Sequence, residues 1–148
     1  MNYVFSTKKV VKYAFPTHIN ELVLDRADSD FAEVFTVIIE PGNSPPLHKH
    51  DDTEQIFFII EGKGILQTGN KDKVEYDIQP GDVVRIPVST WHKIIANHGE
   101  RIRYLTIDCF GSSPKKDEPT WDSHVKVMCR EHGWDYDKVK ISNNRNNN

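Results

Sequence analysis

The chain has 148 residues and a formal net charge of −3, with 37% hydrophobic and 28% charged residues. The length fits one ordinary domain with its own core, and the composition is typical of a globular protein. Lysine and arginine are scattered along the chain and no segment is long and apolar enough for a membrane span, so we expect neither a nucleic-acid-binding protein nor a membrane protein.

The cysteines and the first residues indicate the cellular compartment. Cys109 and Cys129 are the two cysteines, which are too few for a disulfide framework and suit a reducing environment. Residues 1–15 lack the apolar core and the cleavage site of a signal peptide. We therefore expect a cytoplasmic protein.

Strand-like segments dominate the middle of the chain. They are rich in β-branched and aromatic residues, and each is bounded by glycine, proline, asparagine or aspartate. These segments are 31–42, 54–69, 73–87, 92–97 and 101–110. No segment with helical periodicity interrupts them, which favours an all-β antiparallel sandwich or barrel over residues 31–112, preceded by an N-terminal strand or arm over residues 1–30.

The C-terminal part of the chain has a different pattern. Thr120, after Pro119, is a suitable helix start, and Gly133 is a suitable helix end. Residues at helical spacing form one largely apolar face: Trp121, Val125, Met128 and His132. We expect a short helix within a C-terminal extension over residues 113–142, packed on the outside of the barrel, with a lid or a dimer contact as the alternatives. Residues 143–148 are predicted to be a disordered tail.

Two histidines at the start of an apolar run are the first candidates for a site. His48 and His50 are one residue apart, and residues i and i+2 on a strand point to the same face. Two imidazoles on one face can converge on a single point, where a metal ion is the obvious occupant. Two histidines alone do not establish such an ion.

Residues 42–97 resemble the two sequence motifs of the cupin family. The first motif is matched by Gly42, His48, His50, Glu54 or Gln55, and Gly62. The second is matched by Gly81, Pro87, Ser89, His92 and Asn97, where Ser89 replaces a glycine and Asn97 comes one residue late. The resemblance implies a cupin double-stranded β-helix, which is a jelly-roll barrel, around one divalent transition metal ion bound by His48, His50, His92 and a fourth ligand. Such ligands suit Zn, Fe, Mn, Ni or Co.

The fourth ligand is either Gln55 or Glu54. Both lie at an allowed distance after His50, but Gln55 has the spacing to Gly62 that the motif requires, and Glu54 is one residue too early. Neighbouring residues on a strand face opposite sides, so only one of the two points inward. The apolar residues that follow do not discriminate between the two registers. The spacing favours Gln55.

The ligand set bears on the function that the resemblance implies. Three imidazoles and an amide are neutral, so the ion keeps its full charge and polarises oxygens strongly. This favours isomerase, tautomerase or lyase chemistry on a small polar metabolite, such as a sugar acid or a keto acid. With Glu54 as the ligand, a metal-dependent dioxygenase becomes the alternative. A non-enzymatic cupin that binds or senses a small molecule is the other alternative.

Several further residues have expected roles. Glu54, Tyr104 and Asp108 are unranked candidates for a general base. Arg85, which interrupts an apolar run, is a candidate for binding a substrate carboxylate, and Phe57 is a candidate for a substrate contact. The remaining histidines are expected in solvated or interfacial positions: His18, His98, His124 and His132. We expect a homodimer, because exposed sheet edges of such barrels often pair.

Overall fold

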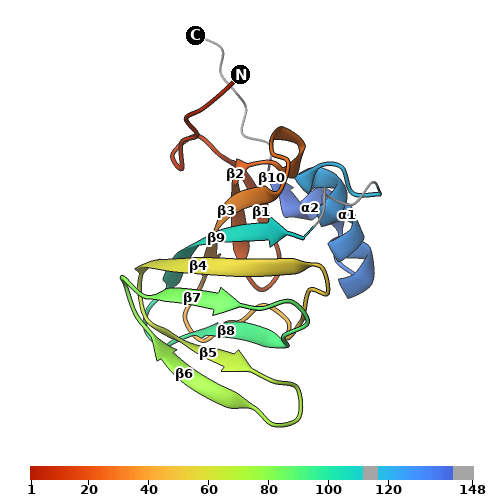
Figure 1. The fold of residues 1–148 in the computed structure, drawn as a ribbon. Coiled ribbons are helices and arrows are strands. Elements are labelled where there is room, and N and C mark those ends of the chain that lie inside the picture. Colours follow the sequence, from red (N-terminus) through yellow and green to blue (C-terminus); the bar gives the residue numbers. More distant parts are fainter. Residues whose placement is uncertain (112–116, 142–148) are drawn as a thin grey trace.

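Two antiparallel sheets enclose the interior of the protein (Figure 1). The computed structural model describes residues 1–111 and 117–141. Within these residues the larger sheet has seven strands, in the order β10 (Lys140–Ile141), β1 (Val11–Ala14), β2 (Ile19–Leu24), β3 (Ala32–Ile39), β9 (Ile102–Phe110), β4 (Thr53–Glu61) and β7 (Val83–Ile86). In the same part of the chain the smaller sheet has three, in the order β6 (Val74–Ile78), β5 (Gly64–Thr68) and β8 (His92–Ala96). The predicted all-β jelly-roll barrel is confirmed, whereas the predicted tail lies outside the described residues.

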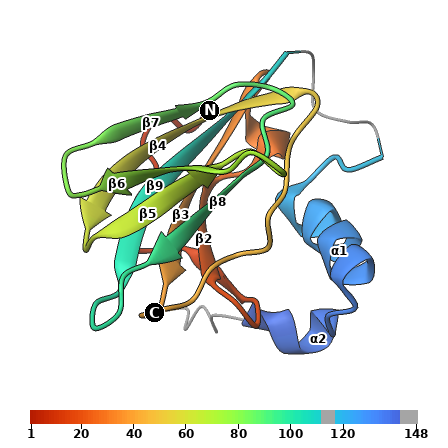
Figure 2. The same cartoon turned by 90° about the horizontal axis from the view of Figure 1, so that it is seen from below.

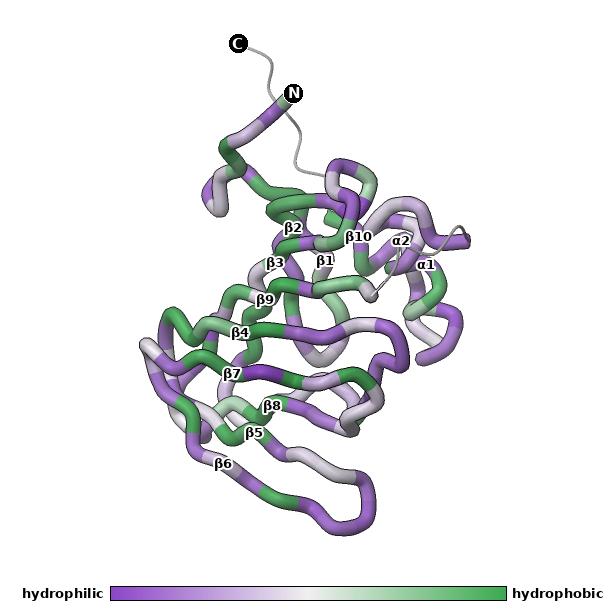
Figure 3. The backbone as a smooth tube through the Cα atoms, viewed as in Figure 1, coloured by the Kyte–Doolittle hydropathy of each residue, from purple (hydrophilic) through white to green (hydrophobic). Residues whose placement is uncertain are grey.

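Alternation along β4 and β9 makes the inner face of the larger sheet. Buried and less buried residues alternate from Thr53 to Ile59 on β4 and over most of β9. The two strands pair so that Gln55 lies opposite Asp108 and Phe57 lies opposite Thr106. One end of the inner face is therefore apolar, and its other end carries buried polar side chains. In Figure 3 the hydrophobic part of β4 is one continuous stretch, so burial alternates there although hydropathy does not, and the β5–β6 turn is hydrophilic.

The first strands of the chain belong to the larger sheet. β1 pairs with β2, and β2 pairs with β3 along most of its length. The short strand β10 then returns from the C-terminal extension and pairs with β1, with Lys12 opposite Ile141. Strand pairing thus continues across residue 30, where the sequence suggested a boundary.

Helix α1 (Trp121–His132) lies beside the strands at one end of the barrel, followed by the short helix α2 (Tyr136–Val139) (Figure 2). Thr120 and Ser123 form a reciprocal capping box at the start of α1, and Gly133 ends it with a φ of 68°. Both predicted ends are therefore confirmed. Trp121, Val125 and Cys129 are buried against the barrel. No helix in the described residues is long and apolar enough to cross a membrane.

Candidate metal centre

Three histidines meet at the polar end of the barrel. Each of His48, His50 and His92 offers a ring nitrogen, and these atoms lie within 4.8 Å of one another. His48 and His92 form an isolated β-bridge, in which the His92 amide donates to the His48 carbonyl at 2.9 Å and the His48 amide donates back at 3.2 Å. Backbone pairing therefore brings together two imidazoles that are far apart in the sequence.

Ser89, which precedes His92, forms hydrogen bonds with the segment that carries His50. Its φ is 59°, in the left-handed region, at the position where the family motif has a glycine. Such a backbone costs a residue with a side chain about 1–2 kcal/mol. The Ser89 amide donates to the His50 carbonyl at 2.6 Å, and the Ser89 hydroxyl donates to the Asp51 carboxylate at 3.0 Å. These two hydrogen bonds offset the cost and hold His50 beside the second segment.

Backbone carbonyls fix the tautomers of two of the histidines. The Nδ1 atoms of His48 and His92 lie 2.8 Å from the carbonyl oxygens of Pro46 and Thr90. A carbonyl only accepts, so each Nδ1 carries the hydrogen, and Nε2 of each neutral ring holds a lone pair. Burial lowers the pKa of His48, and it lowers the pKa of His92 to about 4. Both rings are thus neutral near pH 7, as metal ligation requires.

Gln55 faces the interior next to His92 and is 5% exposed. Its Nε2 donates to Asp108 Oδ1 at 2.7 Å, and its Oε1 lies 2.9 Å from His92 Nε2. Gln55 Oε1 and His92 Nε2 are both acceptors, so a cation bound between them would resolve an otherwise repulsive contact. Two atoms that share an ion at ligand distances of about 2.1 Å, at right angles, are about 3 Å apart. The donor set therefore fits a divalent transition metal ion.

Glu54 and Arg85 lie outside the barrel, which corrects the roles expected for them. Arg85 Nη2 lies 2.6 Å from Glu54 Oε2, and their side chains are 65% and 34% exposed. Arg85 alternates with the inward-facing Val84 and Ile86, and Glu54 neighbours the inward-facing Gln55. Neither side chain lines the interior cavity. Arg85 is therefore not placed to bind a substrate there, and Glu54 is not placed to act as the fourth ligand or as a base.

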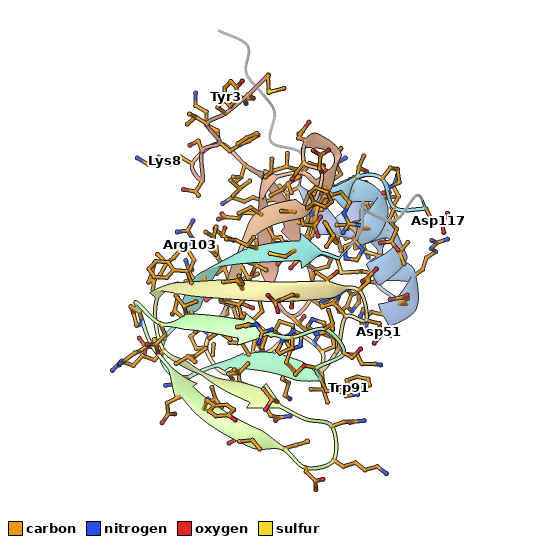
Figure 4. All side chains as sticks on the ribbon, in the orientation of Figure 1. Tyr3, Lys8, Asp51, Trp91, Arg103 and Asp117 are labelled. Carbon is orange, nitrogen blue, oxygen red and sulfur yellow. The ribbon has the colours of Figure 1, made fainter. Side chains whose placement is uncertain are left out.

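A cavity of about 550 Å³ joins the three histidines to helix α1. Phe57, Tyr104 and Asp108 line it, as expected of a substrate contact and of candidate bases. The Phe57 ring centroid lies 6.2 Å from that of His92 and 5.1 Å from that of Tyr104. In Figure 4 Asp51, another lining residue, is at the end of the barrel where α1 lies. The cavity is therefore walled by the barrel on one side and by the C-terminal extension on the other.

Three histidines that were expected in solvated or interfacial positions line the same cavity: His18, His124 and His132. His98, by contrast, is exposed in a turn. A signal for two of the three was present in the sequence, because His124 and His132 share a helical face with Trp121 and Met128. The expectation is confirmed for His132, which is exposed at the edge of the cavity, and fails for the half-buried His124, because the face of α1 that packs on the barrel covers a cavity instead of closing against the core.

A buried charge network supports His124. Its Nδ1 donates to the Glu118 carboxylate in a short hydrogen bond. Arg26 Nη1 contacts Glu118 through the backbone oxygen at 3.2 Å and through Oε2 at 3.6 Å. Glu33 in turn binds Arg26 with two hydrogen bonds of 2.7 and 2.9 Å. Bidentate pairing of this kind holds the network in one arrangement.

Asp108 connects this network to the histidine cluster. It accepts a hydrogen bond from Gln55, and it also lies beside Glu33. Burial first, and then the Glu33 carboxylate, raise the pKa of Asp108 well above its ordinary value, which favours the neutral acid. Burial likewise raises the pKa of Tyr104. Burial thus favours the protonated form of both groups.

Comparison with known proteins identifies the family. The family model of the cupin domain, Cupin_2, matches residues 35–108, which is half of the chain. An uncharacterized protein from Methanocaldococcus jannaschii is 37% identical over 57 residues, and the match covers 38% of this chain and 43% of that protein. The chain thus matches less than half the length of this relative.

Solved structures share the fold. The polyketide cyclase RemF from Streptomyces resistomycificus has a TM-score of 0.65 at 20% identity, over 77% of this chain and 82% of that chain. A predicted oxalate decarboxylase from Thermotoga maritima has a TM-score of 0.63 at 19% identity, over 73% of this chain and 99% of that one. At such identities the similarity is one of fold alone. With the family-model match and the double motif, these comparisons establish that the chain belongs to the cupin family.

Proposed function

We propose that the protein is a metal-dependent enzyme that isomerises, tautomerises or cleaves a small polar metabolite. The main support is the contact between Gln55 Oε1 and His92 Nε2, two acceptors 2.9 Å apart. His48, His50, His92 and Gln55 would hold one divalent ion, with Zn, Fe, Mn, Ni and Co as the candidates. Because all four ligands are neutral, the bound ion would polarise a substrate carbonyl or carboxylate oxygen strongly.

Of the two substrate classes that the sequence suggested, a keto acid suits the cavity better than a sugar acid. Arg85 lies outside the cavity, so a substrate carboxylate would have to be held by the bound ion and not by this arginine. A 2-keto acid carries its carboxylate next to its carbonyl, so both groups can lie at the histidine cluster. Phe57 and Tyr104 next to that cluster would exclude water from the reacting carbonyl.

Proton transfer needs a base, and we assign that role to His124. Of the earlier candidates, Glu54 lies outside, and burial raises the pKa of Tyr104 and of Asp108, which favours their protonated forms. The Nδ1 hydrogen of His124 is held by Glu118, which leaves the lone pair on Nε2. Burial, followed by the charge of Arg26, lowers the pKa of His124, so the ring is neutral near pH 7.

In the proposed step Nε2 of His124 removes a proton from the carbon next to the substrate carbonyl. The electron pair of the broken C–H bond forms the carbon–carbon double bond of an enolate, and the π pair of the carbonyl bond moves onto the carbonyl oxygen. The proton stays on His124 and returns to the substrate in the reverse step. Glu118 stabilises the imidazolium that forms meanwhile. Arg26 and Glu33 are positioning residues, because Arg26 holds Glu118, Glu33 holds Arg26, and neither of them lines the cavity.

The experiment that tests this function follows α-proton exchange in D₂O by NMR. Metal-loaded and metal-free protein are each incubated with a panel of 2-keto acids and sugar acids. We expect faster exchange of at least one keto acid with the loaded protein. Equal rates with loaded and metal-free protein across the whole panel would overturn the proposal.

We also propose that a second copy of the chain covers apolar side chains on β4 and β7. Phe58, Ile60 and Val83 are 46%, 39% and 68% exposed, and Phe58 pairs with Val83 at the edge strand of the larger sheet. A charged side chain in that position would disfavour pairing of two such edges. Sedimentation should give a dimer for the wild type and a monomer for Val83→Lys, whereas a monomeric wild type would contradict the proposal.

A further inference from the structure

We propose that the cavity binds a keto acid whose aromatic ring carries a hydroxyl group, with the ring packed beside Phe35, Phe57 and Trp121. This inference rests on the proposed function, and it assigns the part of the substrate that lies away from the histidine cluster. It is supported by unpartnered polar atoms, by the ring surface of the cavity and by the charges around it.

Three residues that line the cavity each carry a buried polar atom with no hydrogen-bond partner among the described residues: Asn20 Oδ1, Thr106 Oγ1 and Trp121 Nε1. The three residues are 4%, 1% and 2% exposed. Buried polar groups are almost always hydrogen-bonded, so three exceptions on one cavity wall need a reason. Asn20 offers an acceptor, Trp121 a donor and Thr106 both. The wall is thus suited to a ligand with a polar substituent such as a hydroxyl.

Strand register places two of these residues, Thr106 and Asn20, on the inner face of the larger sheet. Thr106 lies opposite Phe35 on β3 and opposite Phe57 on β4, and Asn20 lies opposite Val37. Thr106 is two residues, or about 7 Å, along β9 from Asp108, the hydrogen-bond partner of Gln55. A ligand held at the histidine cluster therefore extends toward Thr106.

Aromatic side chains line much of the cavity between the histidine cluster and Thr106. The ring centroids of Phe35 and Trp121 are 4.5 Å apart, and Phe57 stands next to His92. The cavity volume of about 550 Å³ is well above the roughly 150 Å³ that suffices to hold benzene in a protein interior. Offset or edge-on packing against these rings favours a planar ring in the ligand. A sugar would lose water from its hydroxyl groups against the same surface.

Charges around the cavity limit the ligand to a single carboxylate. Besides Asp108, whose neutral form is favoured, the acidic lining residues in the described part of the chain are Asp51, Asp52, Glu118 and Glu131. The basic lining residues there are Lys49 and Lys93, and no arginine lines the cavity. Lys49 is already paired with Asp51 at 2.8 Å. A ligand with several negative charges would be repelled, whereas one carboxylate at the histidine cluster meets the bound cation.

Three probes of increasing complexity test the inference: 2-oxobutanoate, phenylpyruvate and 4-hydroxyphenylpyruvate. Zinc stoichiometry is measured first, and each probe is then titrated into the zinc-loaded protein by calorimetry. We expect phenylpyruvate to bind at least tenfold more tightly than 2-oxobutanoate, and the ring hydroxyl to add about fivefold. Thr106→Val should abolish the gain from the hydroxyl and keep the gain from the ring.

Thr36→Val is the matched control, because it makes the same chemical change at a paired hydroxyl. Thr36 is fully buried, donates to Glu21 at 2.6 Å and does not line the cavity. Thr36→Val should lower the melting temperature and retain the order of the three affinities. Thr106→Val should raise the melting temperature, because it removes an unpartnered hydroxyl from the folded state.

The outcomes separate this inference from the proposed function. Equal affinities for the three probes, or no binding to protein that holds its zinc, would overturn the inference and leave the proposed function to the exchange experiment. A protein that binds no zinc would overturn the proposed function and this inference with it. A Thr106→Val variant that still distinguishes the two aromatic probes as the wild type does would also overturn the inference.

Discussion

Replacement of Gln55 by methionine tests the metal centre through the proposed ligand that is not a histidine. Gln55→Met keeps the length of the side chain but removes the oxygen that lies 2.9 Å from His92 Nε2. It also removes the hydrogen bond to Asp108, the group that orients the amide. Loss of an orienting partner alone costs 10–100-fold in metal affinity, about 1.4–2.7 kcal/mol, so loss of the ligand with its partner should cost about 100-fold or more.

Glu54→Met is the matched control, one residue earlier on the same strand. Glu54 points out of the barrel and pairs with Arg85, an exposed ion pair that contributes about 0–1 kcal/mol to stability. Its replacement should leave zinc affinity within about twofold of the wild type. Competition with a chromogenic chelator measures both affinities. Loss of zinc from Glu54→Met together with retention by Gln55→Met would refute the register of β4 and the ligand set.

Three further predictions concern proton transfer, pH and the buried charges. His124→Asn should slow α-proton exchange by about 100-fold or more at unchanged zinc affinity, while His98→Asn, an exposed control, should leave both unchanged. The metal-free protein should lose stability as the pH falls from 6.5 toward about 4, because the unfolded chain takes up a proton at His92 and the folded chain does not. Urea unfolding should show that this residue lowers the free energy of unfolding by at most about 3 kcal/mol. A free energy of unfolding that rose over this pH range would contradict the prediction. Arg26→Met should lower the free energy of unfolding by about 3–5 kcal/mol in the same assay, because it leaves the fully buried Glu33 carboxylate without its cation. A decrease below about 1 kcal/mol would show that the ion pair contributes little to stability.

Local patterns account for what the sequence predicted well. Alternation and turn residues marked the barrel strands, and capping residues marked both ends of α1. The choice of Gln55 over Glu54 as the inward residue came from motif spacing, since the apolar residues after them fit either register. The side chain of Gln55 does face inward, as its contact with Asp108 shows.

Tertiary packing accounts for what the sequence did not predict. Arg85 was taken for a cavity residue because it interrupts an apolar run, yet the run alternates, with Val84 inside and Val83 outside. The role proposed for His124 depends on Glu118 and on Arg26, and Arg26 is so far from both in the sequence that its contact with Glu118 is a product of the tertiary fold. A helical pattern reveals an apolar face but not whether that face closes a core or covers a cavity.

The central claim is that four side chains from three separate segments bind one ion inside the barrel. Anomalous diffraction from crystals of the zinc-loaded protein tests it most directly. We predict a single strong peak bonded to the imidazoles of His48, His50 and His92 and to Oε1 of Gln55. A peak at Glu54, or no peak among the three imidazoles in protein that binds zinc stoichiometrically, would contradict the account.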